Sequence, residues 1–175
     1  MYGIIATWRM ALEGISEAAD MLKKSADAGD SIETAIRAVE DFEFYKSVGY
    51  GGLPNEEMEV ELDAAFMDGD TLDVGCVGAI KDYANPVSIA RMLSKEPVNN
   101  FLVGAGAEKY AHRHGFERKN MLTERAKIHY HNRVKETTEN TELKPYSGHD
   151  TVGMVCLDDK GHMTAATSTS GLFMK

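Results

Sequence analysis

Cysteines and basic residues are scarce in this sequence, and long apolar runs are absent. Two cysteines, Cys76 and Cys156, form neither a disulfide framework nor a CxxC metal-binding motif. The 19 lysines and arginines face 28 acidic residues, which gives a net charge of −9. This balance disfavours a nucleic acid or an anionic membrane as partner, because phosphates must be neutralised by Lys and Arg. No apolar stretch approaches the roughly 18–20 residues that span a bilayer.

The N-terminal residues carry no basic stretch, and their apolar run is too short for a secretory signal peptide. We therefore expect a cytoplasmic protein. A chain of 175 residues, of which 43% are hydrophobic, supports one full core rather than two. The sequence thus predicts one domain.

Hydrophobic periodicity predicts an α/β (α+β) fold with helices packed outside the sheets. Asp30 and Glu33 resemble a capping box that begins a helix, and Asp68 with Gly69 predicts a two-residue hairpin turn. The predicted strands are residues 3–7, 60–66, 72–80, 101–103, 152–157 and 163–169. The predicted helices are residues 12–22, a helix from Asp30 that ends before Phe44, a helix from Pro86 that ends before Pro97, and residues 108–114 and 123–135.

Residues 136–148 are polar and show little periodicity, so we expect an exposed linker there. This linker leads through His149 and Asp150 to Thr151, which immediately precedes a predicted strand. A threonine hydroxyl is a poor nucleophile without a base. If the Asp150–Thr151 bond is cut, the α-amino group of Thr151 supplies one, since its pKa of about 7.7–8.0 lets it be neutral near working pH. An exposed linker accommodates such a cut.

Spaced motifs along nearly the whole chain carry a family resemblance. HDTVGM at 149–154, followed by ATSTSG at 166–171, is similar to the glycosylasparaginase branch of the N-terminal-nucleophile hydrolases. The upstream segments match the same family in the same order: ATW at 6–8, SVGYGG at 47–52 and LDAAFMDG at 62–69. The His-Asp pair before the threonine favours this branch over the plant-type asparaginases and isoaspartyl peptidases, which usually carry Gly-Thr there.

The resemblance implies an αββα sandwich and self-cleavage between Asp150 and Thr151. In that scheme Asp150 assists the cleavage, His149 helps to hold the strained scissile turn, and Thr151 becomes the nucleophile. The implied reaction is hydrolysis of the side-chain amide of an N4-substituted asparagine such as glycosylasparagine. The nearest alternative is an L-asparaginase or β-aspartyl peptidase. Trp8, Ser47 and Thr169 match family positions that shape the pocket or hydrogen-bond the nucleophile.

The resemblance also implies that the C-terminal part of the family fold is missing after Lys175. The family continues with an Arg-Val-Gly-Asp segment that binds the substrate and a Thr-Gly pair that forms the oxyanion hole. Residues 1–150 thus resemble an α-subunit and residues 151–175 the opening of a β-subunit. We expect residues 1–175 alone to have little amidase activity, and to need the remaining β-subunit part in assemblies of paired heterodimers. The alternative is an inactive fragment that acts only with a separate β-chain.

Without the resemblance, the same residues have ordinary structural explanations. Trp8 is a core anchor, Ser47 a turn residue and Thr169 a strand former. The pairs His112/His114 and His129/His131 are compatible with a metal site, but i,i+2 residues on a helix do not face each other, so solvated positions explain them better. The expected substrate is a small asparagine derivative, and no cofactor or metal is implied because nucleophile, base and oxyanion donors are all protein groups.

A group of three aspartates is compatible with a cation site. Asp63, Asp68 and Asp70 lie close together in the sequence. The predicted hairpin turn accounts for Asp68, and Asp70 fits a solvated flanking position. Asp63 lies inside an apolar strand and receives no derived role.

Overall fold

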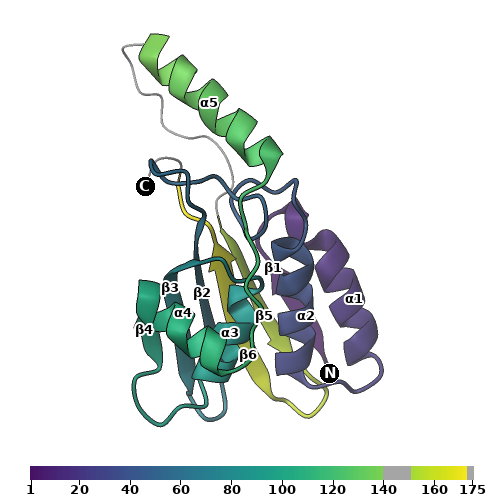
Figure 1. Ribbon diagram of the computed structural model, residues 1–175. Coiled ribbons are helices and arrows are strands. Elements are labelled where there is room, and N and C mark those ends of the chain that lie inside the picture. The colour runs from purple at the N-terminus through teal and green to yellow at the C-terminus, as the bar shows by residue number, and fades with distance from the viewer. Residues whose placement is uncertain (140–150, 173–175) are drawn as a thin grey trace.

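The structure is a computed structural model that describes residues 1–139 and 151–172. Within these ranges the chain forms a single six-stranded sheet with helices packed on one face (Figure 1). This is a mixed α/β arrangement, as predicted, and it is consistent with half of the expected αββα sandwich: one sheet and one helical layer.

Alternating apolar and polar residues produce the strands, and chain segments far apart in sequence pair in the sheet. The order is β1-β5-β6-β2-β3-β4, with only β3 and β4 parallel. The strand that follows Thr151 therefore lies between the N-terminal strand and β6. The strands are β1 (Gly3–Ala6), β2 (Glu61–Asp68), β3 (Val74–Lys81), β4 (Phe101–Val103), β5 (Val152–Leu157) and β6 (Met163–Thr169).

The helices that pack on the sheet bury their apolar stripes against one of its faces (Figure 1). Ile32 and Ile36 of α2 are fully buried over β5 and β6, and Leu93 of α3 is fully buried over β2 and β3. Helix α5 instead projects away from one end of the sheet (Figure 1). The helices are α1 (Leu12–Leu22), α2 (Ala28–Glu40), α3 (Pro86–Leu93), α4 (Gly104–Arg113) and α5 (Glu124–Glu139), with a 3-10 turn, Arg9–Ala11, before α1.

The opposite face of the sheet is covered by no helix of the described residues. Its side chains form cross-strand rows, because Ile5 pairs with Val155 and Met67 pairs with Ala165 on neighbouring strands. Ile5 is 71% exposed, and Phe101 on the edge strand β4 is 66% exposed. A row of exposed apolar side chains across a sheet is typical of a surface that packs against another layer.

Two predicted details, a helix start and a hairpin turn, were wrong. The N-cap of α2 is Asp27, whose side chain accepts a hydrogen bond from the Gly29 backbone N–H at 2.8 Å, so the helix begins before Asp30. Asp30 instead forms an ion pair with Arg91 at 2.7 Å. The hairpin after Asp68 has a loop of residues 69–73 instead of a two-residue turn, because the Asp68 carboxylate binds two loop N–H groups.

The predicted linker at 136–148 was also wrong in its first residues. The α5 backbone continues to Glu139, beyond the predicted end at residue 135. Residues 140–148 of the linker lie outside the described residues. Among the helices that are described, none is both long and apolar enough to cross a membrane.

Candidate active site

Thr151 lies at the end of the sheet from which α5 projects, immediately before β5 (Figure 1). Thr7 holds it from the neighbouring strand, because the Thr7 hydroxyl donates to the Thr151 carbonyl at 3.3 Å and accepts from the Gly153 N–H at 2.9 Å. The Thr7 N–H also donates to the Gly153 carbonyl at 2.9 Å. The backbone around Thr151 is therefore fixed to the end of β1, while its side chain remains half-buried.

Thr169 and Ser47 lie on the other side of Thr151. The antiparallel register pairs Val152 with Ser168, which places Thr151 opposite Thr169. The Thr169 hydroxyl contacts the Ser47 carbonyl at 3.3 Å and accepts from the Gly171 N–H at 3.0 Å. Ser47, Thr151 and Thr169 thus gather at one end of the sheet, as the motif match requires.

The glycines at 49–52 let the loop after α2 approach β6 closely. A Cβ on Gly52 would lie 2.6 Å from the Ser170 side chain, and a Cβ on Gly49 would lie 2.2 Å from the Glu40 carbonyl oxygen. Gly49 also has a φ of 64°, a conformation that favours glycine. The glycine-rich motif therefore positions buried Ser47 beside Thr169.

Trp8 follows Thr7 directly and adopts a costly backbone conformation. Its φ of 61° and ψ of 151° fall in a region used almost only by glycine, which costs a tryptophan on the order of 1–3 kcal/mol. Its side chain is 49% exposed. The interpretation of Trp8 as a buried core anchor was therefore wrong, and its position next to Thr7 fits a residue at the rim of a site.

Two of the predicted residues, His149 and Asp150, lie outside the described residues. Asp63 has a structural role that sequence reasoning missed. Its carboxylate accepts a hydrogen bond from the Ala79 N–H at 2.8 Å and so holds the irregular pairing between β2 and β3. Asp63 also pairs in register with Thr169.

Glu40 is a buried carboxyl group behind this end of the sheet, and sequence reasoning did not single it out. It is fully buried at the end of α2, where it accepts hydrogen bonds from the Val87 N–H at 3.1 Å and the Asn85 amide at 3.3 Å. Burial raises its pKa to about 8, although the hydrogen bonds from Val87 and Asn85 oppose this increase. Glu40 thus links the end of α2 to the start of α3.

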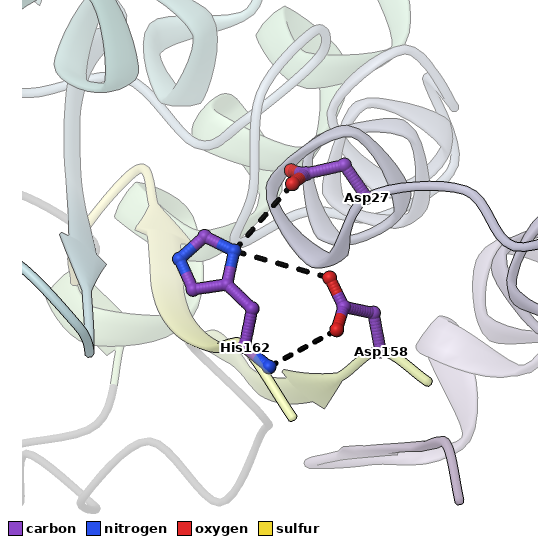
Figure 2. Close-up of side chains that lie close together, drawn as sticks. All are labelled: Asp27, Asp158 and His162. Carbon is purple, nitrogen blue, oxygen red and sulfur yellow. Dashed lines mark hydrogen bonds and ion pairs between the residues drawn. The ribbon is translucent and has the colours of Figure 1, made fainter. Parts of the chain in front are cut away.

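A second polar cluster lies at the opposite end of the sheet, at the β5–β6 hairpin. His162 Nδ1 lies 3.5 Å from the Asp27 carboxylate and 3.9 Å from that of Asp158, as Figure 2 shows. On its other side, His162 Nε2 lies 3.1 Å from Asp68 and 3.8 Å from Asp70. Asp27, Asp158 and His162 each offer one ligand atom within 4.8 Å of one another, so these three could hold a small cation.

The surrounding carboxylates stabilise the charged form of His162. Its pKa is raised, first by the hydrogen bond to Asp68 and then by the charges of Asp68, Asp70 and Asp27. Burial alone would raise the pKa of Asp68, but hydrogen bonds from His162 and from the loop backbone lower it to about 2. Sequence reasoning did not predict this cluster, because its members come from three separate turns.

Replacing His162 with glutamine is expected to weaken the protein more at low pH than at high pH. A histidine with a raised pKa in the folded state contributes its stabilisation fully below pH 6.5, and this contribution is lost as the pH rises through the folded pKa. The expected loss is about 1 kcal/mol at pH 6 and less at pH 9, measured by urea denaturation. The matched control His112→Gln changes an exposed histidine. Equal losses at both pH values would contradict the prediction.

Comparison with known proteins identifies the family of this chain. The model of the asparaginase family (Asparaginase_2) matches residues 5–175. An N(4)-(Beta-N-acetylglucosaminyl)-L-asparaginase of Elizabethkingia miricola is 35% identical over 98% of this chain and 50% of its own length. An isoaspartyl peptidase/L-asparaginase of Rattus norvegicus is 38% identical over 93% of this chain and 50% of its own.

A plant-type L-asparaginase of Thermococcus kodakarensis is 34% identical over 87% of this chain and 53% of its own length. The chain therefore spans about half the length of the curated relatives that it matches. The family match covers nearly all of the chain and includes every segment that meets at Thr151. The chain belongs to the asparaginase family Asparaginase_2.

Proposed function

We propose that this chain is part of an amidohydrolase that cleaves the side-chain amide of N4-substituted asparagine, with Thr151 as nucleophile. The observation that carries the proposal is the position of Thr151. It immediately precedes β5, an interior strand, and lies between Thr7 and Thr169 at the sheet end where the glycine-rich loop brings Ser47. Hydroxyl groups suit the support of a nucleophile because each one both donates and accepts hydrogen bonds.

The nucleophile forms in two steps. The Thr151 hydroxyl oxygen attacks the Asp150 carbonyl carbon, the peptide C–N bond breaks, and the nitrogen takes a proton to become the α-amine of Thr151. Water then hydrolyses the resulting ester and restores the hydroxyl. In this proposal Asp150 assists the first step, and His149 holds the scissile turn.

Substrate cleavage uses the same hydroxyl with the new amine as its base. The amine takes the hydroxyl proton while the oxygen attacks the side-chain carbonyl carbon of the substrate. The amide C–N bond breaks, the leaving nitrogen receives that proton, and a β-aspartyl ester remains on Thr151. Water hydrolyses this ester to release aspartate. No step requires a cofactor or metal.

The remainder of the protein would complete the site and cover the open sheet face. The exposed row with Ile5 and Phe101 suits a second sheet, and the relatives are about twice as long as this chain. The absent part would supply the oxyanion donors and the clamp for the substrate carboxylate, in heterodimers that pair with one another. Removal of one oxyanion donor typically costs about 10²–10³-fold in turnover.

A second candidate is L-asparaginase or β-aspartyl peptidase activity. The relative from Rattus norvegicus, an isoaspartyl peptidase/L-asparaginase at 38% identity, favours it. Both candidates use the same nucleophile and differ in the group that leaves. Turnover of aspartyl-glucosamine, asparagine and a β-aspartyl dipeptide by the full-length protein distinguishes them.

Intact mass spectrometry of the full-length protein tests the nucleophile directly. We expect incubation to yield two pieces, one that ends at Asp150 and one that begins at Thr151. N-terminal sequencing of the second piece should read Thr-Val-Gly-Met. An active protein that keeps a single uncut mass would contradict the proposal, since Thr151 would then lack its α-amine.

A further inference from the structure

A cavity of about 450 Å³ lies beside the Thr151 end of the sheet. One of its walls comes from the turn after β1, and the other from the segment that leads into the glycine-rich loop. Its lining residues are Arg9, Met10, Glu13, Phe44, Tyr45, Lys46 and Ser47.

Both walls connect directly to the residues around Thr151. Arg9 follows Trp8 and Thr7, and the Thr7 hydroxyl donates to the Thr151 carbonyl. On the other wall, the Ser47 carbonyl accepts from the Ser170 N–H at 2.7 Å as well as from the Thr169 hydroxyl. The segments that line the cavity are therefore connected to β1 and β6, the strands on both sides of Thr151.

The cavity carries positive charge in a chain whose net charge is −9. Among the described residues, neither Arg9 nor Lys46 lies within ion-pair distance of a carboxylate, whereas the half-buried Arg91 has two close acidic partners. The guanidinium carbon of Arg125, on α5, lies 4.7 Å from the centre of the Phe44 ring, which lines the same wall as Lys46. One acidic residue, Glu13, also lines the cavity. Because Arg9 and Lys46 outnumber it, the net charge of the lining residues remains positive.

The effect of this charge is visible on a neighbouring side chain. The pKa of His129 on α5 is lowered by burial and then by the charges of Lys46 and Arg125. The part of this decrease that comes from Lys46 and Arg125 reflects their positive charge beside the Lys46 wall. Positive charge attracts an anionic group, and an Arg–Lys pair is well suited to a carboxylate because guanidinium groups bind carboxylates through two parallel hydrogen bonds.

We propose that Arg9 and Lys46 form a subsite for the carboxylate of the leaving group. The inference rests on the proposed amidohydrolase function and, between its two candidate substrate classes, favours the second, the β-aspartyl peptides. Cleavage of a β-aspartyl dipeptide releases an amino acid, whose carboxylate is one carbon away from the nitrogen that leaves. Asparagine releases ammonia and glycosylasparagine releases a glycosylamine, and neither carries a carboxylate. The subsite therefore favours β-aspartyl dipeptides over both.

The test compares β-aspartyl-alanine with β-aspartyl-alaninamide, which differ only in the carboxylate, in the full-length protein. We expect kcat/KM to be at least about tenfold higher for the acid, in the range of a charge-assisted hydrogen bond. The double variant Arg9→Gln, Lys46→Gln should lose this preference, chiefly through a higher KM for the acid. Because the preference is a ratio within one preparation, partial misfolding of the variant does not affect it.

Two further variants sharpen the result. Lys24→Gln removes an exposed lysine beyond the far end of α1 and should keep the preference. Lys46→Arg retains the charge and should keep most of it. Equal hydrolysis of acid and amide by the wild type, or a preference that survives the double variant, would overturn the subsite alone. If the full-length protein hydrolyses none of the four compounds (the two β-aspartyl compounds, asparagine and aspartyl-glucosamine), the proposed function is overturned. The subsite proposal then falls with it.

Discussion

Replacement of Thr151 with alanine is expected to stop both self-cleavage and amide hydrolysis in the full-length protein. The variant lacks the hydroxyl oxygen that forms both ester intermediates, so turnover should fall at least about 10⁴-fold. Intact mass should show one uncut species. Steady-state hydrolysis of asparagine and of aspartyl-glucosamine measures the loss of turnover.

Thr151→Ser is the matched control, since it keeps the hydroxyl and would still acquire an α-amine. We expect it to cleave itself and to retain slower turnover. The Thr151 side chain is half-buried, so loss of its methyl group costs little stability and thermal unfolding should change by a few degrees at most. Turnover by Thr151→Ala within tenfold of the wild type would mean that another residue is the nucleophile.

Replacement of Glu40 with alanine is expected to give the largest loss of stability among the residues discussed. The Val87 N–H would lose its acceptor in a buried place, and the missing side chain would leave a cavity between α2 and α3. An unsatisfied buried donor costs about 1–3 kcal/mol and the cavity adds to this, so we expect a loss of about 3–5 kcal/mol by urea denaturation. The neighbouring variant Asp41→Ala changes an exposed carboxylate and should cost less than about 1 kcal/mol.

Glu40→Gln separates the charge of this residue from its packing. The folded pKa of Glu40, about 8, lies above its usual value of 4.5, so the folded state holds a proton that the unfolded state releases between these pH values. The free energy of unfolding should therefore decrease from pH 5 to pH 8, by up to about 1.4 kcal/mol per pH unit. Glutamine carries no titrating group and should remove this slope. If the wild type and Glu40→Gln have parallel profiles, Glu40 is not the titrating group.

Local patterns were enough to predict the strands around Thr151. The structure confirms residues 152–157 and 163–169 as strands with the predicted bounds, because these short segments are rich in apolar and β-branched residues and alternate residues are buried along each of them. The start of α2 was missed by three residues. Asp27 and Asp30 are both able to cap a helix, and only the backbone path before Ala28 and the ion pair of Asp30 with Arg91 separate them.

Some features of the candidate site were likewise predictable from the sequence and others were not. The short motifs identified Trp8, Ser47, Thr151 and Thr169, and the fold brings their segments to one end of the sheet. The strain at Trp8, the burial of Glu40 and the position of Lys46 next to the cavity could not be predicted, because each depends on contacts between segments that are distant in the chain.

The sequence by itself determined the α/β class and the two strands on either side of the turn at 158–162. It also determined the threonine on which the proposed chemistry depends. Periodicity and motif spacing are local properties, so one chain is enough to reveal them. Only the tertiary structure decided that His162 lies among four carboxylates, that Glu40 is buried where α2 meets α3 and that one sheet face of the described residues stays open. The charge around His162 and the burial of Glu40 depend on residues that folding brings together. Because these residues are far apart in the sequence, their spacing could not predict either property.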